Sequence, residues 1–224
     1  MLELGIKFLL SYFIGSLMGS MIMGRLRGGV DIRTLGSGNP GGTNALRTQG
    51  RAFALGVMTI DIGKGAIGAG LVPLLEIPGV GADPAVSRAW LALACAAAAV
   101  VGHGWPIWHE FRGGKGAATM IGTLIVLAPG LVLPLLLVWA WMLILFGFVG
   151  LATITAGLAA PLYLVLTRMP QDQPLLAYTA AMALYLLYSH RANIRRMRAG
   201  SEPRYRHLML FRRGRGGNGA DDDD

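Results

Sequence analysis

The sequence predicts an all-α integral membrane protein, a polytopic helical bundle with about seven transmembrane helices. Of its 224 residues, 54% are hydrophobic and only 14% are charged, and the mean hydropathy is +0.53. A soluble domain is usually about one-quarter charged. Long apolar segments alternate with short polar ones, and a helix needs about 20 apolar residues to cross the hydrocarbon core. We expect one membrane domain over residues 1–210, and a disordered tail over residues 211–224, which ends in four aspartates.

The predicted spans lie between charged or glycine- and proline-rich breaks. Residues 117–166 form fifty uncharged positions, which Pro129-Gly130, Gly147 and Gly150 divide into three helices. The spans predicted in order are residues 4–24, 52–75, 88–101, 117–128, 131–148, 151–166 and 175–188. The fourth is short for a full crossing, and five spans are the alternative if the uncharged stretch crosses only once.

Basic residues are concentrated in three of the connecting segments. Lys and Arg number five in residues 25–51, two in residues 102–116, and nine after Tyr188. The positive-inside rule places these three segments in the cytoplasm. An odd number of spans then puts the N-terminus outside and the C-terminus in the cytoplasm.

The first basic segment contains DIRTLGSGNPGGTNALR, residues 31–47. Residues 36–41 match G-x-G-x-x-G, but a dinucleotide-binding motif must follow a strand and open a helix, whereas this segment follows a membrane span. Its glycines still let backbone N–H groups turn toward an anion, and a helix beginning near Thr43 would favour negative charge. Arg47 can bind a phosphate through two hydrogen bonds. The pattern fits either an anion site or a tight turn between helices.

The second segment, GHGWPIWHEFRGGKGAAT over residues 102–119, places Lys115 between glycines. It lacks the glycine and Ser/Thr positions of a Walker loop, but it offers a mobile ammonium beside an accessible backbone. His103 fits a polar cap at a helix end as well as a site residue. No Cys/His grouping has zinc spacing, so we expect no metal and no cofactor.

The third segment, SHRANIRRMRAGSEPRYR over residues 189–206, places His190 and Asn193 three residues apart. They share one face if the last helix continues. The arginines around them fit attraction to anionic lipid headgroups, but His190 and Asn193 do not serve the positive-inside rule. Within the second span, Asp61 and Lys64 are also three apart. Charges inside a membrane are functional candidates, and here an internal ion pair between packed helices is the simpler interpretation.

Together the three segments resemble the bacterial acyl-phosphate:glycerol-3-phosphate acyltransferases of the PlsY type. The resemblance rests on Gly15-Ser16 followed by DIR, GSGN and TNALR, then on GHGWPIW…FRGGKGAAT, and finally on HRANIRRMRAGSE, in that order along the chain. Two departures are Gly42, where the family often has Ala, and Arg112, where Lys is common. The tail from Leu208 onward matches no part of the family.

The resemblance implies an enzyme in the bacterial cell membrane (the inner membrane of a Gram-negative cell) with its active site on the cytoplasmic face. It would transfer a fatty acyl group from acyl phosphate to the 1-hydroxyl of glycerol 3-phosphate, giving lysophosphatidic acid and inorganic phosphate in the first acylation step of phospholipid synthesis. The implied catalytic residues are Ser37, Arg47, Lys115, His190 and Asn193. Substrate phosphate is expected to contact Gly38, Asn39, Gly41, Gly42, Thr43, Asn44, Gly113 and Gly114. His103, Glu202, Asp61 and Lys64 are expected to support the site.

The residues also bear on mechanism and on competing functions. The sequence has no G-x-S-x-G elbow for a serine nucleophile, and no histidine is followed five positions later by an acid. We therefore expect direct attack without an acyl-enzyme, with His190 acting as a general base or orienting the substrate. A transporter of phosphorylated solutes would need polar residues in several spans and an internal repeat, and a lipid-binding scaffold would not need Lys115 and His190. We expect membrane lipids and the two substrates as partners, and no nucleic acid. The sequence does not determine the oligomeric state, and a monomer is compatible with it.

Overall fold

A computed structural model describes residues 1–210, and these residues are helical with no β-strand among them. The predicted tail over residues 211–224 lies outside the described residues. The helices are α1 (Leu2–Gly15), α2 (Gly19–Leu26), α3 (Gly42–Gln49), α4 (Arg51–Ala66), α5 (Arg88–Gly104), α6 (Ala117–Leu127), α7 (Pro129–Phe146), α8 (Val149–Thr167), α9 (Gln173–Ser189) and α10 (Arg191–Arg198). The predicted all-α class is confirmed.

Several helices are long and apolar enough to cross a membrane. Four meet this test in the described chain: α4 with its continuation to Leu74, α5 with its continuation to His109, α7 and α8. A fifth is added if α1 and α2 are counted as one bent span. With a rise of about 1.5 Å per residue, the 11 residues of α6 reach only half of a hydrocarbon core about 30 Å thick. Seven spans, and the orientation of the termini, remain predictions.

The first predicted span is broken rather than straight. Residues 4–24 were expected to form one helix, but α1 ends at Gly15, α2 begins at Gly19, and their axes differ by 42°. Met18 has an extended backbone at the break. Gly15 lies so close to α5 that a Cβ there would overlap the backbone of Ala99. Gly15 therefore lets the end of α1 pack closely on α5 just before the break, a contact that no local pattern encodes.

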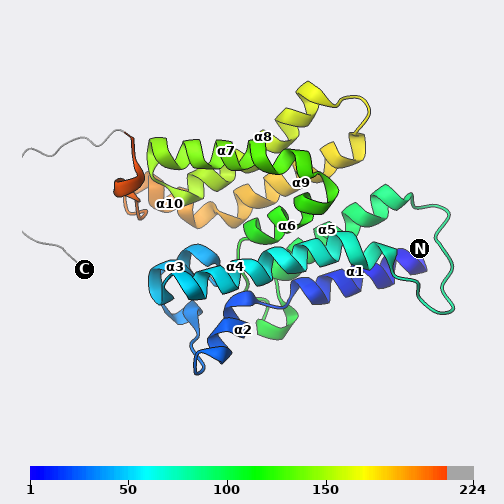
Figure 1. Cartoon of the computed structure of the whole chain (residues 1–224), viewed down its shortest axis with the longest axis horizontal. Coiled ribbons are helices and arrows are strands. Elements are labelled where there is room, and N and C mark those ends of the chain that lie inside the picture. Colours follow the sequence, from blue (N-terminus) through cyan, green and yellow to red (C-terminus); the bar gives the residue numbers. More distant parts are fainter. Residues whose placement is uncertain (211–224) are drawn as a thin grey trace, which may run out of the picture.

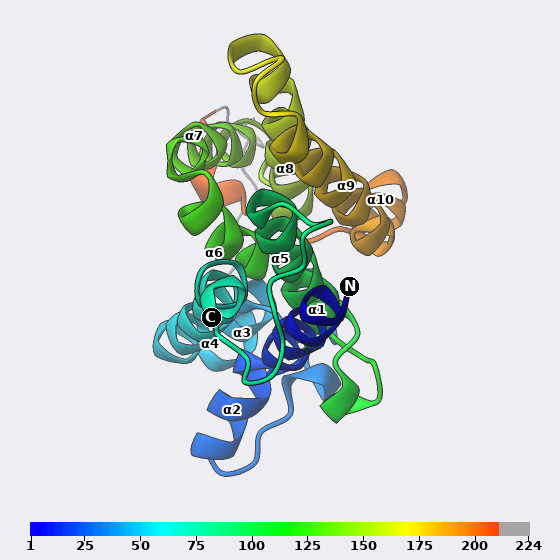
Figure 2. The same cartoon turned by 90° about the vertical axis from the view of Figure 1, so that its right-hand side faces the viewer.

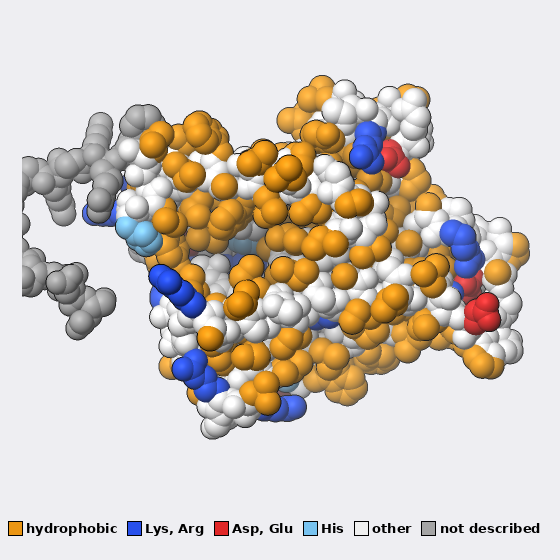
Figure 3. Space-filling model, viewed as in Figure 1, with side chains coloured by type: hydrophobic (Ala, Val, Ile, Leu, Met, Phe, Trp, Pro, Cys, Tyr) orange, Lys and Arg blue, Asp and Glu red, His pale blue; other side chains and the backbone are white. Residues whose placement is uncertain are grey.

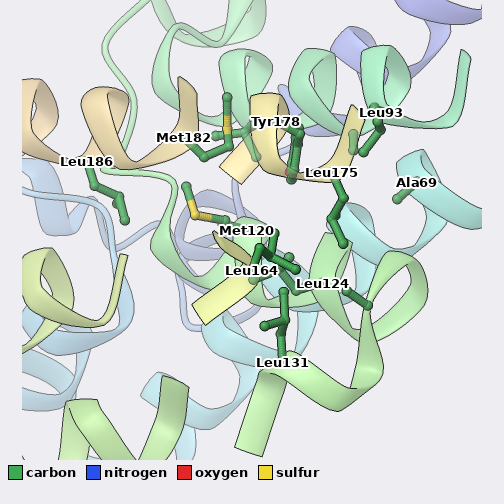
Figure 4. Packing of buried hydrophobic residues seen from close by; sticks show 13 residues of the cluster. Ala69, Leu93, Met120, Leu124, Leu131, Leu164, Leu175, Tyr178, Met182 and Leu186 are labelled. Carbon is green, nitrogen blue, oxygen red and sulfur yellow. The ribbon is translucent and has the colours of Figure 1, made fainter. Parts of the chain in front are cut away.

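The helices form two groups, which are joined by α6 and by the packing of α5 on α9 (Figures 1 and 2). In one group α1 packs on α5 and α4 packs on α6, and in the other α7, α8 and α9 pack in sequence. Helices α4 and α6 approach closely because a Cβ on Gly65 or Gly122 would overlap the backbone of the opposite helix. Between the groups lies the largest apolar cluster, where side chains of α5, α6, α8 and α9 meet (Figure 4).

The two ends of the bundle differ from its sides. Hydrophobic side chains cover much of its length, while Lys and Arg gather toward the ends (Figure 3). Helices α3 and α10 lie at one end, and the N-terminus lies at the other (Figure 1). At the N-terminal end the buried Glu3 accepts hydrogen bonds from Lys7 at 2.7 Å and from Arg88 at 2.7 and 2.8 Å. The polar segments singled out in the sequence belong to the end with α3 and α10.

Candidate active site

A cavity of about 680 Å³ begins at this end and runs into the bundle. Its polar part is formed by the start of α3, the loop before α6, and the region where α9 meets α10. Its deeper part has apolar walls from α6, α7, α8 and α9, including Leu124, Leu135, Ala160 and Met182. A hollow on the face shown in Figure 3 lies between the two groups of helices. One continuous space thus joins a cationic end to an apolar interior.

The glycine-rich segment is held in shape by Asn44. Its Nδ2 donates to the carbonyl oxygens of Ile32 and Leu35, both at 3.0 Å, and its Oδ1 accepts from the backbone N–H of Ser37 at 3.0 Å. Gly36 has a φ of +57°, which glycine adopts readily. Both amide protons of Asn44 are therefore used within the protein, where they hold the loop.

The start of α3 faces the cavity. Gly41, Gly42 and Thr43 line the space, and no side chain caps the helix at Gly41. The first N–H groups of an α-helix lack partners within the helix and favour an anion. Arg47 follows one turn later and also lines the cavity. By contrast Arg33 is paired with Asp31 at 2.8 Å outside the lining, and this pairing lowers the pKa of the Asp31 carboxyl.

On the opposite side of the cavity, a chain of hydrogen bonds leads from Lys115 to α10. The Nζ of Lys115 donates to Oδ1 of Asn193 at 2.5 Å, and Nδ2 of Asn193 donates to Oε1 of Glu202 at 2.6 Å. The other carboxylate oxygen of Glu202 accepts from Nε of Arg196 at 2.6 Å. Because Asn193 is held at both ends, its carbonyl oxygen is fixed toward the lysine.

Burial shifts the pKa values of two cavity residues. Desolvation, with repulsion from Arg196 and Arg47, lowers the pKa of Lys115 to about 8, against a smaller opposing effect of Glu202. Desolvation and the neighbouring Lys115 lower the pKa of His190 to about 4. At neutral pH the lysine is therefore mainly charged and the histidine is neutral. The site presents cations to a ligand without an ionised histidine.

The hydrogen bonds of His190 define which ring nitrogen is free. Its Nδ1 lies 2.9 Å from the carbonyl oxygen of Leu186, which can only accept, so Nδ1 carries the proton. The Nε2 atom is then an acceptor, and His190 lines the cavity. His190 stands where α9 ends and α10 begins, so the helix does not continue unchanged to Asn193, although both side chains reach the cavity.

The structure brings most of the predicted site residues together. The cavity is lined by Ser37, Asn39, Gly41, Gly42, Thr43, Asn44, Arg47, Asp61, His103, Lys115, His190, Asn193 and Glu202. Gly38 and Lys64 are not among the lining residues. Gly113 and Gly114 line an adjoining pocket of about 260 Å³, which shares Asn39 and Lys115 with the cavity. The positions are thus observed, while the catalytic and binding roles stay predictions.

Three contributors to the site were not singled out in the sequence. Arg196 holds Glu202, and its place three residues after Asn193 was the available signal within the arginine run. Gly150 lies against Asn193, where a Cβ would come within 3.0 Å of that side chain. In the apolar part, Trp139 of α7 donates to Thr153 of α8 at 3.2 Å. The last two depend on contacts between distant segments.

Fold and site together define an integral membrane protein whose cationic site opens into an apolar cavity, as an enzyme acting on phosphorylated lipid precursors requires. The sequence model described as "Glycerol-3-phosphate acyltransferase" matches residues 5–200. The chain belongs to this acyltransferase family.

Relatives match over nearly their whole length. A glycerol-3-phosphate acyltransferase of Synechococcus elongatus is 41% identical over 88% of this chain and 91% of its own, and one of Rhodospirillum rubrum is 39% identical over 91% of each. The crystal structure of PlsY, an integral membrane glycerol 3-phosphate acyltransferase, in its glycerol 3-phosphate form has a TM-score of 0.77 at 32% identity, covering 90% of this chain and 95% of that one. Its lysophosphatidic acid form has a TM-score of 0.75 at 31% identity, with the same coverage.

Proposed function

We propose that this protein transfers a fatty acyl group from acyl phosphate to the 1-hydroxyl of glycerol 3-phosphate, at the cytoplasmic face of a bacterial membrane. The products are lysophosphatidic acid and inorganic phosphate. The observation that carries the proposal is the single cavity that joins Arg47 and Lys115 to apolar walls between α6, α7, α8 and α9. Both substrates are phosphates and one bears an aliphatic chain, so this arrangement matches their chemistry.

The two ends of the cavity suggest how the substrates lie. Arg47, Lys115 and the N–H groups at the start of α3 offer hydrogen bonds and positive charge to phosphate oxygens. The apolar walls accommodate the acyl chain, whose removal from water stabilises binding by about 0.8 kcal/mol for each buried methylene. The acyl carbonyl then lies at the boundary between these parts, near His190. PlsY, to which this chain is similar, has been solved in forms with glycerol 3-phosphate and with lysophosphatidic acid.

The reaction then needs one displacement. The 1-hydroxyl oxygen attacks the acyl carbonyl carbon, the bond from that carbon to the phosphate oxygen breaks, and phosphate leaves with the bonding pair. Holding the hydroxyl against the carbonyl supplies much of the rate, and Lys115 and Arg47 stabilise charge that develops on phosphate and carbonyl oxygens.

The hydroxyl proton has two candidate acceptors. Nε2 of His190 is free, but its pKa is lowered to about 4. A phosphate monoester has a second pKa of about 6 and is the stronger base. We therefore infer that Nε2 of His190 accepts the hydrogen bond of the hydroxyl and orients it before attack, and that this proton passes to a substrate phosphate as the new carbon–oxygen bond forms.

Direct attack is favoured over an acyl-serine intermediate. In residues 1–210, the Ser37 hydroxyl has no hydrogen bond to a histidine that could activate it, and Ser37 is exposed at the cavity. An activated serine needs an adjacent base within hydrogen-bonding distance. Ser37 is better suited to contact a substrate phosphate.

The test uses purified full-length protein in detergent with acyl phosphate. Phosphate release that depends on glycerol 3-phosphate, with one lysophosphatidic acid formed per phosphate, is the expected result. Acyl-CoA in place of acyl phosphate serves as the alternative donor and should give no product. Absence of phosphate release, or equal release without glycerol 3-phosphate, would overturn the proposal.

A further inference from the structure

We propose that Asp61, Lys64 and His103 form a buried positioning group, which sets the place of Lys115 in the cavity through Gly113 and Gly114. This inference rests on the proposed function only in taking Lys115 as a substrate-binding cation. It assigns a task to three buried polar residues, of which Asp61 and His103 line the cavity and Lys64 lies behind them.

The ammonium of Lys64 has an acceptor for each of its protons. Its Nζ donates to the carbonyl oxygen of Leu17 at 2.7 Å, to Oδ1 of Asp61 at 2.9 Å, and to Nδ1 of His103 at 2.8 Å. The three residues of the positioning group are 1% to 4% exposed. An ammonium can only donate, so Nδ1 of His103, which also lies 3.5 Å from Oδ1 of Asp61, is assigned as the acceptor, and the ring is then neutral with its proton on Nε2. One rotamer and one tautomer of His103 are thereby selected.

His103 in turn supports the loop that carries Lys115. The backbone N–H of Gly114 donates to the carbonyl oxygen of His103 at 3.0 Å. A Cβ on Gly114 would overlap Nε2 of the ring, and a Cβ on Gly113 would overlap the carbonyl oxygen of His103. The two glycines therefore wrap around the histidine at a distance that no other residue allows. The ring therefore packs directly against the backbone immediately before Lys115.

From this loop Lys115 reaches across the cavity to Asn193 at 2.5 Å. The lysine is thus fixed from both sides, by α10 at its tip and by the positioning group at its backbone. A buried ion pair is weak evidence for added stability, because desolvation offsets its attraction. The hydrogen bonds of this group fix the orientation of the His103 ring. Three apolar side chains of equal volume would not do so, because only directional bonds select one ring orientation.

The test is a variant that keeps Lys64 satisfied but removes the ring edge from Gly114. In His103→Asn, the shorter amide retains an oxygen near the position of Nδ1. We expect the protein to fold and kcat/KM for glycerol 3-phosphate to fall roughly 10- to 100-fold, as expected for a displaced substrate-binding group. The alkaline limb of the kcat/KM profile should also move to higher pH, because a loosened Lys115 gains water. The titratable and charged groups that face Lys115 are Arg47 of α3, Arg196 of α10, Glu202 after α10, and His190 between α9 and α10, which stays neutral across this range.

Lys7→Met is the matched control. Lys7 is buried to the same degree as Lys64 and is also paired within a helix, but it lies at the N-terminal end, where it donates to Glu3 and to the carbonyl oxygen of Pro73. The Lys7→Met variant should have a lower Tm, while kcat, KM and the pH profile of the folded enzyme should be unchanged. If His103→Asn behaves in the same way, the positioning group is only structural and the proposal is wrong.

A second variant covers the case in which His103→Asn does not fold, and a second measurement follows the titration of Lys115 without turnover. Should His103→Asn fail to fold, the double variant Asp61→Asn with Lys64→Met removes both charges together and is expected to give the same changes in KM and pH profile; a profile identical to wild type would contradict the proposal. Labelling of the Lys115 amine across pH gives its titration without turnover. An unchanged titration in the variants overturns the inference even if the acyltransferase reaction is confirmed, whereas lack of wild-type turnover overturns only the proposed function.

Discussion

Lys115 and Asn193 are 78 positions apart in the chain, yet Nζ of the lysine lies 2.5 Å from Oδ1 of the asparagine. The bond joins the loop before α6 to α10 across the polar part of the cavity. It uses one of the three protons of the ammonium, so two remain for substrate oxygens. This relationship places a partly desolvated cation where phosphate oxygens are expected to bind, and the first predictions follow from it.

Replacing Lys115 with methionine should lower kcat/KM for glycerol 3-phosphate roughly 100-fold or more, because one preorganised electrostatic partner of the substrate is lost. Lys115→Arg should recover little of this, since a planar guanidinium cannot take the place of a compact ammonium between glycines. Steady-state kinetics on variants with wild-type elution profiles measures the effect. Arg195→Met removes an exposed cation of α10 that does not line the cavity, and should keep activity within about twofold of wild type. Wild-type kinetics in Lys115→Met would contradict the assignment.

The pH dependence of kcat/KM should show the lowered pKa of Lys115. The lysine is charged below its pKa of about 8 and neutral above it, so attraction for substrate phosphate is present at lower pH and is lost as pH rises through about 8. An unperturbed lysine would place this loss near pH 10.4. His190, with a pKa of about 4, stays neutral throughout and adds no limb near pH 6.5. Rates measured with both substrates held below KM, from roughly pH 5 to 11, distinguish the two positions of the alkaline limb.

Much of this site could be predicted because its groups lie close to recognisable local patterns. The glycine-rich segment over residues 31–47 indicated either an anion site or a tight turn, and the resemblance of all three basic segments to one family then singled out Lys115, His190 and Asn193. The all-α class followed from hydropathy in the same way. These features depend on residue type and short spacing, which the sequence displays directly.

Other features depend on contacts that local patterns do not encode. The bend between α1 and α2 arises where Gly15 meets Ala99 of α5, and Asn44 was expected to contact phosphate although its amide protons are used by Ile32 and Leu35. The link from Lys64 through His103 to Gly114 joins three separate segments. Residue type alone cannot distinguish a polar group that faces a ligand from one that is satisfied by the backbone.

Glu202→Gln should weaken catalysis without removing any residue expected to touch substrate. The carboxylate accepts from Asn193 and from Arg196, both at 2.6 Å, and its side chain is 7% exposed. A glutamine offers one acceptor and one donor, so one of the two partners is left facing an N–H group. An unsatisfied buried donor costs about 1–3 kcal/mol. Because about 1.4 kcal/mol corresponds to a tenfold change in rate, we expect kcat/KM to fall roughly tenfold or more.

Glu110→Gln provides the comparison for Glu202→Gln. Glu110 also lies near an arginine, Arg112, at 3.9 Å, but its side chain is 78% exposed and solvent screens the pair. Its variant should match wild type in kcat/KM and in Tm. If the two glutamine variants are indistinguishable, Glu202 does not hold Asn193 in the manner described.

The apolar part of the cavity should determine how acyl phosphates are bound. Ala156 and Ala160 of α8 line it one turn apart, about 6 Å along the helix axis, with Ala160 farther from the polar end. Ala156→Leu and Ala160→Leu should each raise KM for long-chain acyl phosphate and leave KM for glycerol 3-phosphate near wild type, because every methylene displaced into water costs about 0.8 kcal/mol. Ala156→Leu should affect shorter chains as well, whereas Ala160→Leu should affect only the longer ones.

Ala159→Leu is the matched control, because it adds the same volume to α8 outside the cavity lining and should change neither constant. Kinetics over a series of acyl phosphates of increasing length measures this order, and equal effects of all three substitutions would place the acyl chain elsewhere.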